Sequence, residues 1–208
     1  MTLNPSLFFT QNFKQGTPNT DEVQSIFDYL KDNYDFKNIL EIGFLKGHSA
    51  TWFLETFPNC RVTSVDNILR GNEDALFHHL FRLKYGQKRF KFHYGDSSII
   101  TDFYEPGTFD FAFIDGDHTF EGCLKDIDMC LHLQIPVLLL DNVESNGYCP
   151  ITKEKKDGVS KAIAARSDQL KLIKKFIYYT HRADAPDRPA ERIMELYYVR
   201  TNNIQEQV

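Results

Sequence analysis

The sequence predicts an α/β fold in which helices cover both faces of a doubly wound, mostly parallel sheet. Short apolar runs typical of buried strands alternate along the chain with segments of helical periodicity, and this alternation favours parallel strands. Two β-like runs near the end of the chain predict an antiparallel pair at the sheet edge. Several apolar runs end directly on Asp, at the strand ends where ligands bind in such sheets.

The individual elements follow from the local pattern. After an irregular arm at residues 1–20, apolar side chains recur at helical spacing from Val23 to Leu30. The expected strands are residues 38–42, 61–65, 90–94, 109–114, 135–140, 172–180 and 193–199. The expected helices are residues 47–56, 72–84, 119–132 and 159–168. A Pro-, Asp- and Ala-rich segment at 183–190 is expected to separate the last two strands, and residues 1–208 are expected to form one domain.

Composition excludes several classes of partner. The formal net charge of −5 argues against binding to a nucleic-acid backbone, which requires a dense basic face. No apolar stretch approaches the roughly 20 residues that span a membrane, and the start of the chain does not resemble a signal peptide. The four cysteines form no C-x-x-C pair, so we expect reduced thiols in a cytoplasmic protein.

The turn after the first expected strand carries two glycines, Gly43 and Gly47, behind Glu41. Glycine permits a positive φ and lets a ligand approach the backbone. The spacing is G-x-x-x-G, not the G-x-G-x-x-G that cradles a pyrophosphate. An acid at this strand end fits the positively charged amino group of S-adenosylmethionine, which has no phosphate. The alternative is an ordinary strand-to-helix turn.

The next two strands also end on polar residues. Asp66 follows the second strand, where a carboxylate can accept hydrogen bonds from both ribose hydroxyls of a nucleoside. Asp96 and Ser97 follow the third strand, where either can meet the exocyclic amine of adenine. The alternatives are an exposed turn and a helix cap.

Three further oxygen-bearing side chains follow the two most apolar strands. Asp115 ends one, and Asp141 with Asn142 ends the next. Hard oxygen ligands at adjacent strand ends suit Mg²⁺. Buried strands also need polar stops, so simple termination is the alternative for both acids.

These motifs, in this order, resemble the class I S-adenosylmethionine-dependent methyltransferases. The residues that carry the resemblance are E-I-G-x-x-x-G-x-S, V-D-N, G-D-S and F-I-D-G-D-H. The D-G-D-H segment with the later D-N resembles the metal-dependent small-molecule O-methyltransferases of the catechol, caffeoyl-CoA and macrocin types. The resemblance covers roughly residues 20–200 and implies a Rossmann-like sheet.

The resemblance also implies roles for individual residues. The cofactor-binding residues would be Glu41, Gly43, Phe44, Gly47, Ser49, Asp66, Asn67, Asp96, Ser97 and Asp115. The metal ligands would be Asp115, Asp141 and Asn142, and the catalytic residues His118 and Asp115. Catechol-type enzymes have a catalytic lysine where this chain has His118, whereas macrocin-type enzymes tend to have histidine there. The loop 143–158 would cover the acceptor, and the arm 1–20 is a candidate for packing across a homodimer.

The predicted reaction is the transfer of a methyl group to a small-molecule hydroxyl, catechol-like or on a sugar. A bound Mg²⁺ would lower the pKa of the hydroxyl and orient it, and His118 would remove the proton. One alternative is a metal-independent or N-directed methyltransferase. Another is an inactive cofactor-binding module that serves a partner. A nicotinamide-dependent oxidoreductase is disfavoured by the glycine spacing.

Overall fold

The computed structural model describes residues 20–67, 72–143, 157–182 and 185–200. Most of the arm at 1–20 and most of the loop at 143–158 therefore lie outside the described residues. None of the helices within the described ranges is long and apolar enough to cross a lipid bilayer. Cys60, Cys123 and Cys130 are buried free thiols, and Cys149 lies outside these ranges.

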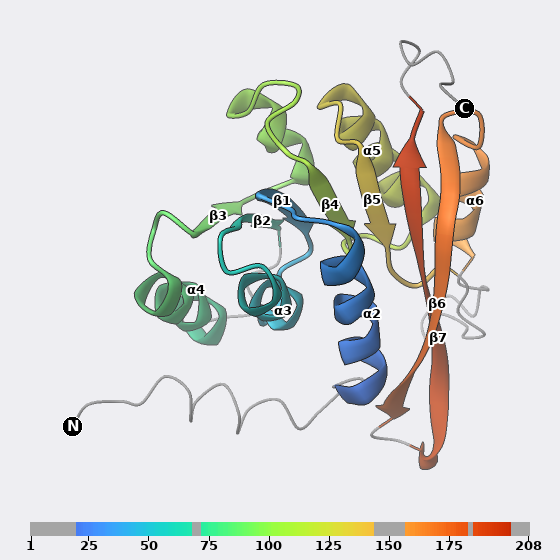
Figure 1. Ribbon diagram of the computed structural model, residues 1–208, viewed down its shortest axis with the longest axis horizontal. Coiled ribbons are helices and arrows are strands. Elements are labelled where there is room, and N and C mark those ends of the chain that lie inside the picture. Colours follow the sequence, from blue (N-terminus) through green and yellow to red (C-terminus); the bar gives the residue numbers. More distant parts are fainter. Residues whose placement is uncertain (1–19, 68–71, 144–156, 183–184, 201–208) are drawn as a thin grey trace.

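The described strands form one seven-stranded sheet in the order β3-β2-β1-β4-β5-β7-β6 (Figure 1). The strands are β1 Asn38–Ile42, β2 Arg61–Asp66, β3 Phe90–Tyr94, β4 Phe111–Ile114, β5 Val137–Leu140, β6 Leu170–Arg182 and β7 Ala185–Val199. Strands β1 to β5 pair in parallel, whereas β7 is antiparallel to both β5 and β6. The strand order reverses between β1 and β4, which creates a switch point of the kind where doubly wound sheets bind ligands.

Helices cover both faces of this sheet, as the alternating sequence pattern predicts. They are α2 Thr20–Asn33, α3 His48–Thr56, α4 Asn72–Tyr85, the 3₁₀ helix η1 Ser97–Asp102, α5 Phe120–His132 and α6 Gly158–Ala164. Two separate cores result. Side chains of α2, α3 and α4 pack on one face, and those of η1, α5 and α6 pack on the other. The doubly wound, mostly parallel fold with an antiparallel edge pair is confirmed.

Successive residues of the central strands divide between the two cores. In β5, Leu139 belongs to the core beneath α2 and α3, while Leu138 and Leu140 belong to the core beneath α5. All three side chains are at most 1% exposed. Because neighbouring residues of a strand point to opposite faces, a strand covered on both sides must be apolar at every position.

The terminal hairpin is longer than the sequence predicts. The segment 183–190 was expected to separate two strands, but β7 begins at Ala185 and pairs with β6 as far as Arg182. Two irregularities in the β6–β7 register accommodate this length. Strand β5 pairs with β7 only along residues 195–198. The prolines of β7 therefore lie in the part that pairs on one side, where a missing N–H donor is tolerated. The last helix, expected over 159–168, already ends at Ala164.

Replacing a core leucine tests the two-sided burial of β5. We expect Leu138→Ala to lower the free energy of unfolding by about 2–5 kcal/mol, because it leaves a cavity in the middle of the sheet. The control is Leu83→Ala on α4, whose leucine is 65% exposed and whose loss should change stability by less than about 0.5 kcal/mol. Urea unfolding followed by circular dichroism measures both. Equal losses in the two variants would contradict this packing.

Candidate functional site

The carboxyl ends of the parallel strands open into a pocket of about 840 Å³. Most of the predicted site residues line it: Gly43, Phe44, Ser49, Asp66, Asn67, Asp96, Ser97, Asp115, His118, Asp141 and Asn142. Two predicted residues, Glu41 and Gly47, lie behind the wall instead. The pocket therefore brings together polar residues that five different strands deliver to one edge of the sheet.

The turn between β1 and α3 requires its two glycines. Gly43 has a φ of 93°, and a Cβ built there would stand 2.2 Å from the backbone oxygen of Asp115. Gly47 has a φ of 74°, and its Cβ would stand 2.5 Å from the ring of Phe81. Any side chain at either position would displace backbone or core. The turn can therefore cross the end of β4 closely, which gives the pocket its floor.

Glu41 holds this turn from below. Its side chain is fully buried, with one carboxyl oxygen accepting from the Ser49 hydroxyl and the other from the Ser64 hydroxyl at 2.5 Å. Burial raises the pKa of Glu41 to about 8, although both hydroxyl hydrogen bonds oppose the shift. Glu41 is thus a structural part of the turn, and only its partner Ser49 reaches the pocket wall.

Asp66 fixes the upper part of the same turn. One of its carboxyl oxygens accepts hydrogen bonds from the backbone N–H groups of Phe44 and Leu45, at 2.9 and 2.8 Å. A carboxylate with two backbone donors is held in a single orientation. The end of β2 is therefore tied to the turn that follows β1, and both sides of this contact line the pocket.

Asp96 and Ser97 begin the 3₁₀ helix after β3. Asp96 accepts from the backbone N–H of Ser98 at 3.0 Å, which makes it the N-cap of η1. It also pairs with Lys125 at 2.5 Å, and this contact lowers its pKa to about 2. The capping role that the sequence left as an alternative is therefore present, on a residue that also lines the pocket.

Ser97 leads to a residue that sequence reasoning missed. Its hydroxyl donates at 2.5 Å to Asp126, a carboxyl on α5 that is 3% exposed and lines the pocket. Burial raises the pKa of Asp126 to about 6. The sequence held a signal, because Asp126 lies three residues after Cys123 and four before Cys130, on the buried stripe of its helix.

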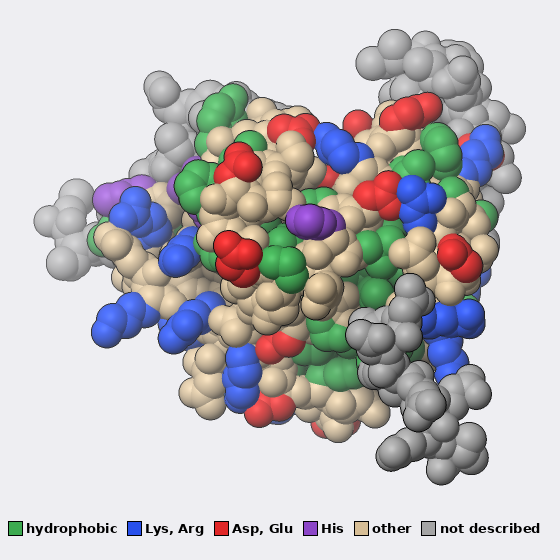
Figure 2. All heavy atoms as spheres, turned by 90° about the horizontal axis from the view of Figure 1, so that it is seen from above, with side chains coloured by type: hydrophobic (Ala, Val, Ile, Leu, Met, Phe, Trp, Pro, Cys, Tyr) green, Lys and Arg blue, Asp and Glu red, His purple; other side chains and the backbone are tan. Residues whose placement is uncertain are grey.

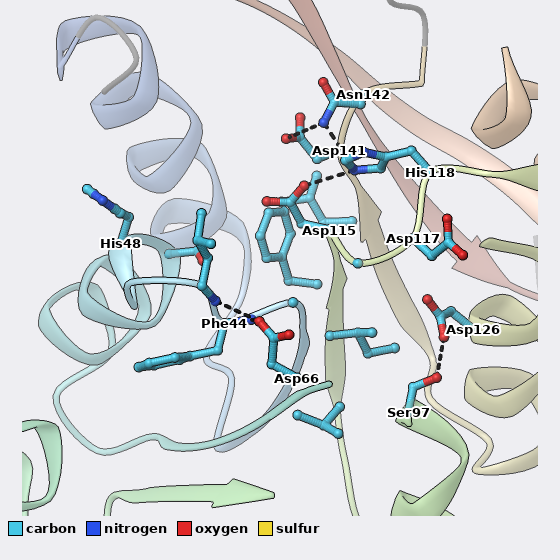
Figure 3. Close-up of a pocket in the computed structure, with 18 of the residues that line it drawn as sticks. Phe44, His48, Asp66, Ser97, Asp115, Asp117, His118, Asp126, Asp141 and Asn142 are labelled. Carbon is cyan, nitrogen blue, oxygen red and sulfur yellow. Dashed lines mark hydrogen bonds and ion pairs between the residues drawn. The ribbon is translucent and has the colours of Figure 1, made fainter. Parts of the chain in front are cut away.

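A second cluster gathers where β4 and β5 end (Figure 3). His118 Nε2 lies 3.1 Å from Asp115 Oδ1 and also 3.1 Å from Asn142 Nδ2. The Nδ2 group of Asn142 is 3.2 Å from Asp141 Oδ2. The four residues that the sequence singled out at these strand ends therefore do form one cluster.

The two acids of this cluster differ in environment. Asp141 is 6% exposed and accepts a hydrogen bond from Tyr178 of β6 at 2.7 Å, whereas the side chain of Asp115 is one-third exposed. Burial and then the charge of Asp115 raise the pKa of Asp141 to about 7. The pair therefore carries a repulsion that a cation between the carboxylates would relieve.

Arg192 of β7 supplies one positive charge at this place. Its guanidinium donates to Oδ1 of Asn142, the only oxygen of that side chain. Asn142 itself has a φ of 57°, a conformation that asparagine tolerates better than most residues. Among the described residues, no three or more His, Cys, Asp or Glu side chains are arranged as a metal site. The oxygens that this cluster offers to a cation are the carboxylates of Asp115 and Asp141 and the amide oxygen of Asn142, which Arg192 also contacts.

One ring nitrogen of His118, Nε2, has two partners. Burial lowers its pKa, but the hydrogen bond and charge of Asp115 outweigh that effect, so the net shift is upward. With a proton on Nε2, the imidazole donates to Asp115. Without it, the same nitrogen accepts from Asn142. Whether Nε2 carries a proton, as it does in one neutral tautomer and in the imidazolium, therefore selects which neighbour it binds.

Tyr178 and Arg192 were not singled out by the sequence. They come from the antiparallel hairpin, and their side chains reach the pocket because of the β5-β7-β6 register. Ser64 had a weak signal as a polar residue inside an apolar strand. The apolar part of the wall includes Phe27 and Trp52, whose rings stack 5.3 Å apart.

Comparison with known proteins finds a family model for the part of the chain that carries most of these residues. Residues 40–142 match a family model described as a methyltransferase domain. This match spans the glycine turn, Asp66, Asp96 and the cluster at Asp115 to Asn142. The predicted resemblance to class I S-adenosylmethionine-dependent methyltransferases is confirmed. No curated protein matches the chain.

Solved structures share the fold. An O-methyltransferase from Bacillus cereus in complex with SAH is 20% identical, with a TM-score of 0.65 over 94% of this chain and 88% of that one. The O-methyltransferase TomG from Streptomyces achromogenes, in complex with SAM, is 16% identical, with a TM-score of 0.63 over 89% and 82%. The N-methyltransferase NodS from Bradyrhizobium japonicum is 15% identical, with a TM-score of 0.62 over 92% of each. These likenesses establish the fold and do not separate O- from N-methylation.

The buried Glu41 predicts a pH-dependent stability. A carboxyl whose pKa rises from its ordinary value to about 8 on folding is protonated in the folded protein and ionised in the unfolded chain between these pH values. The native state then binds more protons, so stability falls as pH rises from about 5 to 8, by on the order of 1 kcal/mol per pH unit.

Glu41→Gln removes this titration and should flatten the decline. Chemical unfolding at pH 5, 6.5 and 8 measures it, with the exposed Glu121→Gln on α5 as the control that keeps the wild-type slope. The assignment is wrong if Glu41→Gln and wild type lose stability in parallel over this range.

Proposed function

We propose that this S-adenosylmethionine-dependent methyltransferase methylates a hydroxyl group of a small molecule, with a Mg²⁺ bound at the ends of β4 and β5. The observation that carries the proposal is the cluster of Asp115, Asp141, Asn142 and His118 in the wall of the pocket. Oxygen ligands and a titratable base stand side by side there. This combination suits the deprotonation of a hydroxyl.

Mg²⁺ fits the chemistry of this donor set. It prefers carboxylate and carbonyl oxygens and binds through one or two carboxylates with open positions for other ligands. Asp115, Asp141 and Asn142 would hold it. Burial is the main cause of the raised pKa of Asp141, and the charge of Asp115, which a bound cation would offset, adds to it. When bound, Mg²⁺ lowers the pKa of an acceptor hydroxyl and fixes its orientation.

The remaining polar wall suits the cofactor. Gly43, Phe44 and Ser49 lie along the turn that would hold the methionine portion, with Gly47 and Glu41 supporting it from behind. Asp66 and Asn67 would bind the ribose at the end of β2. Asp96 and Ser97 line the part of the pocket that would receive the adenine.

His118 would act as the general base for the acceptor hydroxyl. Its Nε2 must be unprotonated to accept the proton, and the acceptor hydroxyl would have to replace the Asn142 amide as the hydrogen-bond donor to that nitrogen. After proton transfer, the imidazolium is stabilised by Asp115 at 3.1 Å. Asp115 would thus serve the reaction as well as the metal. Alignment of the acceptor with the sulfonium methyl would supply much of the remaining rate.

The rest of the proposal concerns the acceptor. The stacked rings of Phe27 and Trp52 in the same pocket support a flat catechol-like acceptor over a sugar.

We further propose that residues 1–208 form one domain, that the loop 143–158 covers the acceptor, and that the arm 1–20 packs across a homodimer. We also propose that the protein acts in the cytoplasm, without nucleic-acid or membrane partners.

A metal-independent methyltransferase, O- or N-directed, is the second candidate. The specific observation in its favour is Arg192, whose guanidinium contacts Asn142 Oδ1 where a metal would bind. A fixed cation near Asp141 can compensate the carboxylates without a metal ion. The two candidates differ in whether Mg²⁺ binds at all.

Cofactor binding is tested by Asp66→Ala. We expect the wild type to bind S-adenosylhomocysteine, and the variant to bind it at least about tenfold more weakly, because hydrogen bonds to a charged group are lost and the turn is loosened. Isothermal titration calorimetry measures both affinities, with Asp102→Ala on η1 as a control outside the pocket lining. A wild type that fails to bind S-adenosylhomocysteine would refute the proposed function.

Metal binding is tested by Asp141→Asn. We expect calorimetric Mg²⁺ binding to the wild type with S-adenosylhomocysteine present, and its loss in the variant, because one of two carboxylate ligands is neutralised. The affinity for S-adenosylhomocysteine should change little. Retained Mg²⁺ binding in the variant would contradict the assignment of Asp141 as a ligand, and no Mg²⁺ binding to the wild type would favour the metal-independent candidate.

A further inference from the structure

Asp126 is a carboxyl of the pocket wall that has no role in the function proposed above. Asp126 projects from α5 beside Ser97, away from Asp141 and Asn142 (Figure 3). Its side chain is 3% exposed, yet it lines the pocket. A buried acid is costly unless its oxygens are hydrogen-bonded or it serves a ligand.

Only one of the two carboxyl oxygens of Asp126 has a protein partner. Oδ1 accepts from the Ser97 hydroxyl at 2.5 Å, and no other hydrogen bond to Asp126 occurs within the described ranges. Oδ2 lies against Gly116, where an added Cβ would stand 3.4 Å from it. Because residue 116 has no side chain, nothing from that position covers Oδ2 on the pocket side. Oδ2 is therefore an acceptor that remains available to a ligand.

The charge of Asp126 favours a donor as its ligand. Burial raises its pKa to about 6, against the opposing effects of Ser97 and Lys125. The nearby acids Asp96 and Asp117 raise it further. At neutral pH the carboxylate form still predominates, and a carboxylate only accepts hydrogen bonds. A ligand group in contact with Oδ2 must therefore carry an N–H or O–H.

The two residues that the sequence assigned to the adenine amine are already engaged. The Asp96 carboxylate accepts hydrogen bonds from the backbone N–H of Ser98 and from the Lys125 ammonium group. The Ser97 hydroxyl donates its hydrogen to Asp126. Asp126 is in direct contact with Ser97 and keeps an oxygen without a protein donor within the described ranges. An unoccupied acceptor for this amine is therefore found on α5, next to the end of β3.

We propose that Asp126 selects the adenine base of the cofactor by accepting a hydrogen bond from its exocyclic amino group at Oδ2, with Ser97 positioning the carboxylate. The proposal rests on the proposed function, because it takes S-adenosylmethionine as the ligand of this pocket. It predicts discrimination against a base with a carbonyl oxygen in place of the amine, since two acceptors would then face each other.

S-Adenosylhomocysteine and its deaminated analogue S-inosylhomocysteine provide the test, because the analogue has that carbonyl oxygen. Calorimetry at pH 7.5 gives both dissociation constants for the wild type, Asp126→Asn and the control Glu121→Gln. Glu121 is an exposed acid of the same helix outside the pocket lining. We expect the wild type and Glu121→Gln to prefer the adenosyl compound at least about tenfold.

Asp126→Asn should bring this ratio close to one, because an amide accepts from the amino group or donates to the carbonyl oxygen. If Asp126→Asn keeps the wild-type preference for the adenosyl compound, the proposal for Asp126 is overturned, whereas the proposed binding of the cofactor is not contradicted. Equal affinity of the wild type for the two compounds would overturn it without recourse to any variant. A wild type that binds neither compound would overturn the proposed function as well.

Discussion

The close approach of the turn after β1 to the end of β4 is the constraint on which the pocket depends. A Cβ at residue 43 would collide with the Asp115 backbone, so only glycine lets the two loops meet. This contact puts the amides of Phe44 and Leu45 within reach of Asp66, which ties β2 to β1. The backbone N–H of Asp115 donates to the carbonyl of Ile42 at the same place. The cofactor wall and the cluster with His118 thus share one backbone contact.

The fold was predictable because its strands are covered on both faces. Residues 137–140 are all apolar and all buried. A short run without any polar position is typical of a strand that is covered on both faces. Polar stops after such runs lie at one edge of a parallel sheet, so Asp66, Asp115 and Asp141 could be expected to converge. The hairpin was less predictable. Composition at 183–190 suggested a break, whereas its backbone pairing with β6 extends the strand.

The partners of the site residues could not be predicted from the sequence for a physical reason. Tyr178 and Arg192 are paired with each other in the β6–β7 hairpin, whose register contains two irregularities, and from there they reach Asp141 and Asn142. Hydrophobic alternation fixes which face a residue points to, but a displaced register decides which neighbour it meets. Asp126 was more accessible to reasoning, because an acid on the buried stripe of an amphipathic helix must have a specific partner. That partner is Ser97.

The charge of the pocket bears on which ligands it can hold. Six Asp side chains line it, against Lys125, Arg192 and two histidines, and Lys125 is already paired with Asp96. Charges of both signs are interspersed on the molecular face shown in Figure 2. Carboxylates in a partly desolvated wall attract a sulfonium and an ammonium group and repel a pyrophosphate. Glycine spacing and pocket charge therefore independently favour S-adenosylmethionine over a nicotinamide dinucleotide, although both ligands use the same kind of sheet.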